Sequence, residues 1–218
     1  MSDVTFPPFP EDLAAHTIVA DPPWRYRDTL PGNKGAADHY DTLTPEQVSS
    51  LGPDVQSVSA DSAHLYLWCT SAFMEDAHTV ARSWGFQPKT LLTWVKVEGD
   101  TPPTLPHERE DTIRVSERMG MGRYFRNSCE YILFATKDNR PLNRQDLPGI
   151  VFANRREHSS KPNKTYRLFE AASDGPYFEM FSRGRREGWY AWGKEAETTE
   201  PSAAPSVDRG RTQDAGVW

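Results

Sequence analysis

Short apolar runs alternate with turn-forming segments along this chain, and the runs have the composition of buried strands. They are rich in β-branched, aromatic and leucine residues and are bounded by Pro, Gly, Asn or Asp. They predict strands at residues 17–20, 64–70, 89–97, 129–137, 149–155, 177–183 and 189–193. Helical patterns occupy several of the segments between these strands.

Helical signals are clearest where a capping residue precedes apolar positions at helical spacing. Residues 71–86 have this spacing, with Ser71 as the expected N-cap, and residues 161–173 predict a further helix. A short helix is expected after Thr44, which can cap it, with Pro45 at the first helical position. Strands that alternate with helices favour an α/β fold, here a mostly parallel central sheet flanked by helices on both faces.

The rest of the chain divides into long loops and irregular ends. Residues 27–44 and 98–118 are rich in turn formers or charges and predict loops, which at that length are usually functional or mobile. The length of 218 residues fits a single domain. We place that domain at residues 16–195, after a proline-rich lead-in at 1–15. Residues 196–218 lack apolar periodicity and are predicted to be a disordered tail.

Composition argues for a folded protein without an obvious electrostatic partner. Seven Trp, eight Tyr and ten Phe argue against disorder, although mean hydropathy is only −0.71. The net charge of −6 gives no global positive field for nucleic acid. Residues 122–127, 155–157 and 183–187 are locally basic, which fits either a basic groove or an ordinary solvated surface.

Cysteine usage and apolar run lengths bear on the cellular compartment. Cys69 and Cys129 form no disulfide or metal-binding pattern, so a reducing, cytoplasmic compartment is expected. The start of the sequence is acidic and proline-rich, unlike a signal peptide. No apolar run approaches the roughly 18 residues that a membrane span needs.

The stretch IVADPPWRYRD, residues 18–28, runs from a predicted strand into an acid, two prolines and a tryptophan. Pro22 has no N–H, and Pro23 restricts it to extended geometry, so we expect the carbonyls of this turn to stay unpaired. Asp21 adds an ionised acceptor, and Trp24 adds a broad face on which a flat ring can stack. In α/β sheets ligands bind beyond the carboxyl ends of the strands, which is where Asp21 falls.

A carboxylate beside a carbonyl can accept both hydrogens of a planar exocyclic amine such as that of adenine. Accepting them aims the nitrogen lone pair at an electrophile, so methylation proceeds by proximity and electrostatics without a strong base. A base inside a duplex must first be flipped out of the stack. The motif alone is equally compatible with a plain turn that Asp21 caps, so both interpretations stay open at this point.

Further blocks follow ADPPWRYR (20–27) along the chain. They are HYDTLTPEQV (39–48), LYLWCTSAFM (65–74), WGFQPKTLLTWVK (84–96), GMGRYFRNSCEYILFATK (120–137), RREHSSKPNKTYRLFE (155–170) and FEMFSRGRREGWYAWGKE (178–195). In this order they resemble the DPPW-type adenine N6-methyltransferases, the family of the eukaryotic messenger-RNA adenosine methyltransferase catalytic subunit, and particularly its bacterial and phage branch. The resemblance covers residues 16–195. It implies a Rossmann-like methyltransferase fold, S-adenosyl-L-methionine as cofactor, and methylation of adenine N6 in nucleic acid.

The resemblance implies a role for each residue of the motif. Asp21 and the Pro22 carbonyl would hold the target amine, Pro23 would shape the turn, and Trp24 would pack beside the base. The expected cofactor-binding residues are Asp21, Lys161, Phe181, Arg183, Lys194 and Glu195. The family's WGNE reads WGKE here, so Lys194 stands where an asparagine near the ribose is expected.

The resemblance also predicts substrate contacts in two loops and at the motif. The expected substrate-binding residues are Trp24, His39, Tyr40, Arg126, Asn127 and Glu130. For Arg126, Asn127 and Glu130, a purely structural hydrogen bond explains the residue nearly as well. This chemistry requires no metal, and no metal site is expected.

Alternatives concern the substrate and the catalytic competence of the chain. DNA is favoured over RNA because the bacterial-type blocks resemble modification enzymes, and RNA adenosine methylation is the alternative. A non-catalytic nucleic-acid-binding subunit would usually lack the acid of DPPW, and cytosine N4 enzymes usually carry serine there, unlike Asp21. The expected partner is nucleic acid and not a membrane, a homodimer or heterodimer is compatible with the sequence, and the expected location is the cytoplasm of a prokaryotic or phage-infected cell.

Overall fold

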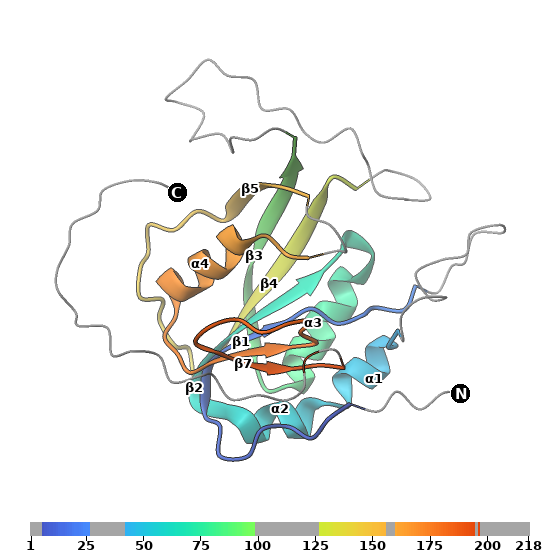
Figure 1. The fold of residues 1–218 in the computed structure, drawn as a ribbon, viewed down its shortest axis with the longest axis vertical. Coiled ribbons are helices and arrows are strands. Elements are labelled where there is room, and N and C mark those ends of the chain that lie inside the picture. The colour runs from blue at the N-terminus through green and yellow to red at the C-terminus, as the bar shows by residue number, and fades with distance from the viewer. Residues whose placement is uncertain (1–5, 27–41, 99–126, 156–159, 195, 197–218) are drawn as a thin grey trace.

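A computed structural model describes residues 6–26, 42–98, 127–155, 160–194 and 196 (Figure 1). Its centre is a seven-stranded sheet in the order β5-β3-β4-β2-β1-β6-β7. The strands are β1 (Ala15–Ala20), β2 (Ser59–Cys69), β3 (Gln87–Val97), β4 (Cys129–Lys137), β5 (Ile150–Asn154), β6 (Tyr177–Met180) and β7 (Trp189–Trp192). The helices are α1 (Pro45–Ser49), α2 (Gly52–Val58), the short 3-10 turn η2 (Ser71–Phe73), α3 (Met74–Ser83) and α4 (Asn163–Ala172).

Strand directions confirm the predicted α/β fold with a mostly parallel sheet. Every neighbouring pair is parallel except the two made by β4, which runs antiparallel to both β2 and β3. The amino end of β4 therefore lies at the same edge as the carboxyl ends of β1, β2 and β3. The register shows this directly, because Tyr131 pairs with Cys69, and Glu130 pairs with Trp94.

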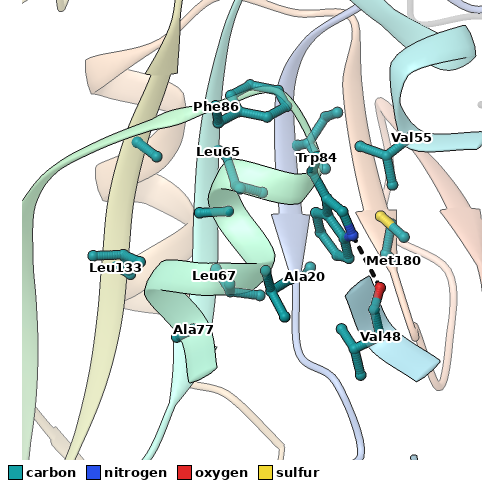
Figure 2. Packing of buried hydrophobic residues seen from close by; sticks show 14 of the residues in the cluster. Ala20, Val48, Val55, Leu65, Leu67, Ala77, Trp84, Phe86, Leu133 and Met180 are labelled. Atoms are coloured by element: carbon teal, nitrogen blue, oxygen red, sulfur yellow. Dashed lines mark hydrogen bonds between the residues drawn. The ribbon is translucent and has the colours of Figure 1, made fainter. Parts of the chain in front are cut away.

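Both faces of the sheet are covered, and successive residues of β1 show how the two cores divide. Ile18 and Ala20 belong to the core beneath α1, α2 and α3, whereas Val19 belongs to the core beneath α4. This alternation follows from the two-residue period of a strand. Figure 2 shows the first core, where the Trp84 indole N–H donates to the Val48 carbonyl at 2.9 Å and ties α3 to α1.

Helix starts test the capping predictions. The Thr44 hydroxyl accepts from the Gln47 N–H at 3.2 Å, and the Gln47 side chain accepts from the Thr44 N–H at 2.9 Å. This capping box confirms Thr44 as the cap of α1. Ser71 as the cap of the next helix is wrong. It begins the 3-10 turn η2 instead, and α3 starts only at Met74, after Phe73, which makes no side-chain cap.

The described part of the predicted lead-in packs against the edge of the sheet. Phe6 stacks on Trp192 with ring centroids 4.7 Å apart, and Phe9 lies 4.4 Å from the same indole. The Trp192 indole N–H donates to the Pro7 carbonyl at 2.8 Å. The chain from Phe6 onward is thus joined to β7, and it brings Phe6 to the edge where β1 ends.

Candidate active site

Asp21 follows β1 directly, and its side chain lines a cavity of about 280 Å³. That volume is at the lower end for small-molecule sites. Most of the lining residues lie at or just beyond strand ends, and Phe6 and Lys161 come from other segments. The lining residues are Phe6, Asp21, Pro22, Pro23, Trp24, Tyr26, Cys69, Thr70, Glu130, Lys161, Phe181, Ser182, Arg183 and Lys194. The structure thus places the cavity where α/β sheets bind ligands, outside the carboxyl ends of parallel strands.

Lys161, just before α4, lies between two carboxylates. Its Nζ is 2.9 Å from Asp21 Oδ2 and 3.0 Å from Glu130 Oε2. The same Nζ lies 4.9 Å from the centre of the Trp68 ring, so it sits above β2. Its side chain is 9% exposed, against 36% for Asp21. The ammonium therefore fixes both carboxylates from inside the cavity, while Asp21 keeps an accessible side.

The pKa shifts of the three groups follow from burial and from this geometry. Burial raises the pKa of Asp21 above its ordinary value, the Lys161 ammonium opposes the rise, and the Glu130 charge adds to it. Desolvation works against ionisation of Glu130, but Lys161 and Lys96 hold its pKa below the ordinary value. Burial would lower the pKa of Lys161, but the two carboxylates raise it. Lys161 is therefore cationic and Glu130 anionic at neutral pH.

The turn after Asp21 corrects one expectation about its carbonyls. The Trp24 N–H donates to the Pro22 carbonyl, and the Leu43 N–H donates to the Pro23 carbonyl, each at 2.8 Å. The prediction that both carbonyls stay unpaired is wrong, because the turn folds back on itself and pairs with the segment before α1. A carbonyl oxygen has two lone pairs, so the Pro22 oxygen still has one for a ligand.

Trp24 is anchored more tightly than the motif suggested. Its ring stacks on Phe73 with centroids 5.1 Å apart, and its indole N–H donates to the Trp68 carbonyl at 3.0 Å. The residue is 8% exposed. One face is covered by Phe73, so the prediction of a broad open stacking face is corrected to a partial one. The neighbouring Tyr26 is the exposed aromatic of this wall, at 54%.

The segment that follows β6 forms the wall of the cavity opposite Trp24 and Tyr26. Phe181 adopts a left-handed φ of 60° and meets the Trp192 ring edge to face at 5.4 Å. The Ser182 N–H donates to the Trp192 carbonyl at 2.9 Å. A Cβ on Gly193 would lie 2.3 Å from the Ser182 oxygen, so only glycine fits between these strands. This close approach brings Arg183 and Lys194 to the same cavity.

The predicted site residues fall into three groups. The cavity unites Asp21, Pro22, Pro23, Trp24, Lys161, Phe181, Arg183, Lys194 and Glu130. Asn127 lies outside the cavity lining, and its amide donates to the Ser71 hydroxyl at 3.3 Å. His39, Tyr40, Arg126 and Glu195 lie outside the described residues. Their roles stay predictions.

Sequence reasoning missed several residues of the site. Phe6 comes from the lead-in, and Tyr26, Cys69, Thr70 and Ser182 also line the cavity. Burial raises the pKa of the Cys69 thiol to about 12, so it is a neutral wall and not a nucleophile. Cys69 and Thr70 end a predicted strand beside the first motif, and this position was a usable signal. Phe6 had no comparable signal.

The chemistry of the lining fits S-adenosylmethionine. Lys161, Arg183 and Lys194 supply cations for a carboxylate, and Asp21 and Glu130 supply acceptors for amino or hydroxyl hydrogens. Phe6 and Phe181 lie 5.7 Å apart at one end and provide aromatic walls for a ring. In the described part of the chain, no cluster of three or more His, Cys, Asp or Glu residues is arranged to hold a metal ion.

The sheet order and the cavity at the strand ends are those of a Rossmann-like methyltransferase fold, and comparison with known proteins gives the family. The model of the MT-A70 protein family matches residues 15–195, and the chain belongs to this family. None of the helices in the described ranges has the length and apolar character needed to cross a membrane.

Several known proteins are identical to the chain at about a quarter of the aligned residues. The type II methyltransferase M.MunI of Mycoplasma sp. is 26% identical over 217 residues, covering 88% of this chain and 82% of the relative. The N(6)-adenosine-methyltransferase MT-A70-like protein of Arabidopsis thaliana is 26% identical, covering 82% of this chain but 23% of the relative. Human N(6)-adenine-specific methyltransferase METTL4 is 27% identical, covering 82% and 36%. The chain thus spans most of the bacterial relative and a minor part of the eukaryotic ones.

Proposed function

We propose that the protein transfers a methyl group from S-adenosylmethionine to the N6 amino group of adenine in nucleic acid, with DNA as the favoured substrate. The observation that carries the proposal is the position of Asp21. Its carboxylate projects from the end of β1 into a cavity, 2.9 Å from a nearly buried lysine, with an aromatic wall on either side. The family match and the names of the relatives support adenine N6 as the acceptor.

Asp21 and the Pro22 carbonyl would each accept a hydrogen bond from one N–H of the adenine amine. Lys161 holds the Asp21 carboxylate at one oxygen and leaves the other for the amine. Withdrawing the nitrogen lone pair from the ring would let it bond to the methyl carbon as the sulfur–methyl bond breaks, and the methylated amine would then release one proton to water. This step needs orientation more than basicity. An ionised carboxylate accepts hydrogen bonds at both oxygens, whereas protonation turns one oxygen into a donor, so the cation beside Asp21 supports the reactive state.

The cofactor would occupy the side of the cavity formed by Phe6, Phe181, Arg183 and Lys194. When bound, S-adenosylmethionine supplies an activated methyl group on its sulfonium. Phe6 and Phe181 would enclose its aromatic part and exclude water, while Arg183 and Lys194 would bind its anionic or hydroxyl groups. The target base would enter on the Trp24 and Tyr26 side, where Tyr26 is exposed.

DNA is favoured over RNA by the extent of the similarity. The chain corresponds to 82% of a bacterial type II methyltransferase but to 23% of the plant adenosine methyltransferase. Its sequence blocks also resemble bacterial modification enzymes. A cytoplasmic location and assembly as a homodimer or heterodimer belong to the same proposal. The predicted tail at 196–218 lies, beyond Ala196, outside the described residues.

A methyl-transfer assay tests the proposal directly. The wild-type protein, Asp21→Asn and Asp21→Ala are incubated with labelled S-adenosylmethionine and matched single- and double-stranded DNA and RNA, followed by nucleoside analysis. We expect N6-methyldeoxyadenosine from the wild type and a loss of at least about a hundredfold in the Asp21 variants. Asp61→Asn, an exposed aspartate at the opposite end of β2, is the matched control and should behave as wild type.

Each outcome decides between hypotheses. N6-methyladenosine in RNA only would replace DNA by RNA as the substrate. Binding of S-adenosylhomocysteine without transfer to any substrate would favour the non-catalytic subunit. Equal transfer by wild type and Asp21→Asn would remove Asp21 from the mechanism.

A further inference from the structure

A row of alternating charges crosses the sheet at the edge of the active site, and its outermost member is Lys96. Lys96 Nζ lies 2.6 Å from Glu130 Oε1, and the other carboxylate oxygen of Glu130 lies 3.0 Å from Lys161 Nζ. Lys161 in turn contacts Asp21 at 2.9 Å. Lys96 is outside the cavity lining, and its side chain is only 8% exposed. Among the described residues, Glu130 is therefore the contact that joins Lys96 to the site.

The register of the sheet explains why these groups share one face. Glu130 of β4 pairs with Trp94 of β3, and Lys96 lies two residues further on the same side as Trp94. Trp68 of β2 pairs with Ile132, which also lies two residues from Glu130. Because β4 is antiparallel, its first residues stand beside the last residues of β3 and β2. The row thus follows the strand order from β3 to β1, with Lys161 above β2.

The charges of the row balance only when Lys96 is present. Asp21 and Glu130 carry two carboxylates, and Lys161 and Lys96 carry two ammonium groups, all partly or fully withdrawn from water. Without Lys96, both carboxylates would share the Lys161 ammonium. Either Lys161 would move toward Glu130 and away from Asp21, or Glu130 would take up a proton, because an uncompensated buried charge is unfavourable.

We propose that Lys96 is a positioning residue of the methyl-transfer site, which acts through Glu130 to hold Lys161 against Asp21. The inference rests on the proposed function for its link to methyl transfer. In the part of the chain that the structure describes, the charged and titratable groups facing Glu130 are Lys96, Lys161 and Asp21, together with the neutral thiol of Cys69. The competing explanation is purely structural: the Lys96 side chain would only pack against Trp94, whose ring centre is 4.9 Å from Lys96 Nζ.

A double-mutant cycle separates the two roles. The proteins are wild type, Lys96→Met, Glu130→Gln and Lys96→Met/Glu130→Gln, with Lys96→Arg as the conservative variant. Lys137→Met is the matched control, since Lys137 is a lysine of β4 at the opposite end of the sheet, where it donates to Ser59. The measurements are kcat and KM between pH 5.5 and 9, and calorimetric binding of S-adenosylhomocysteine.

We expect Lys96→Met to lower kcat by about tenfold and to move the acidic limb of the pH profile upward, because Glu130 then takes up a proton more readily. Lys96→Arg should stay within about threefold of wild type. In the Glu130→Gln background, Lys96→Met should add less than about a twofold effect on both kcat and S-adenosylhomocysteine affinity, because the carboxylate that Lys96 compensates is gone.

The proposal is overturned if Lys96→Met matches Lys137→Met in rate and pH profile, or if it causes the same loss with and without Glu130. If Lys96→Met alone does not fold, the comparison of Glu130→Gln with the double variant still decides, since both lack the unbalanced carboxylate. Wild-type protein that binds S-adenosylhomocysteine but transfers no methyl group would sink the proposed function. Calorimetric binding of S-adenosylhomocysteine across the four proteins of the cycle would still test the coupling between Lys96 and Glu130.

Discussion

Replacing Lys161 by methionine tests the central contact of the site. The substitution keeps the length of the side chain and its packing over Trp68, but it removes the ammonium that lies 2.9 Å from Asp21 and 3.0 Å from Glu130. Among the described residues, Lys96 then remains as the ion-pair partner of Glu130, and Arg183 as the cation that acts on Asp21. The variant therefore isolates the charge of Lys161 from its volume.

The expected loss of stability in Lys161→Met follows from the burial of its ion pairs. Removing one partner of a buried ion pair costs about 3–5 kcal/mol of stability. The side chain of Asp21 is 36% exposed and is partly screened by water, so we take the lower end, about 3 kcal/mol at neutral pH. For a chain of this size, that lowers Tm by roughly 6–12 °C. A displaced Asp21 carboxylate should also lower kcat/KM by about a hundredfold.

The pH dependence gives the sharper test. Because the folded-state pKa of Glu130 is held below its ordinary value of 4.5, its ion pairs stabilise the fold above that pH and lose this effect as the pH falls. The stability difference between wild type and Lys161→Met should therefore be largest near pH 7.5 and shrink below about pH 4.5. Urea unfolding at pH 7.5 and at a pH below about 4.5 measures this stability difference, with Lys137→Met as the control. An equal difference at both pH values, or one below about 1 kcal/mol at pH 7.5, would refute the charge argument.

Three further predictions concern the walls of the cavity and the far end of the sheet. Phe6→Ala should weaken S-adenosylhomocysteine binding about tenfold in calorimetry, because it removes an aromatic wall beside Phe181; unchanged affinity would exclude the lead-in from the site. Gly193→Ala should destabilise the fold by about 2 kcal/mol or more in urea unfolding, because its Cβ would lie 2.3 Å from the Ser182 oxygen, and a neutral effect would contradict that approach. Burial lowers the pKa of His64, whose ring nitrogens contact the Ser173 hydroxyl and the Arg140 carbonyl. Unfolding free energy should therefore fall as the pH drops below about 6.5, the ordinary value, and His64→Gln should flatten that part of the profile; an identical profile in the variant would exclude His64 as its source.

The outcome at the DPPW turn shows how far local sequence reasoning reached. The position of Asp21 at the end of a strand followed from the apolar run before it, and the structure confirms that strand. The state of the proline carbonyls did not follow, because their partners are the N–H groups of Trp24 and of Leu43, which is distant in sequence. Likewise, the motif did not indicate that Phe73, from another segment, covers one face of Trp24.

Residue order along the chain was sufficient for the strands, most helices, the fold class and the residue types of the site, because propensity, capping and periodicity act over a few neighbouring residues. The pairing of strands was not contained in those local patterns. The antiparallel course of β4 brings Glu130 beside Lys96 and Lys161, and packing on Trp192 brings Phe6 to the cavity. These contacts join residues far apart in sequence, and their energies depend on burial and on the balance of neighbouring charges. The motif thus named the carboxylate of Asp21, whereas the folded sheet supplied the charges that hold it in place.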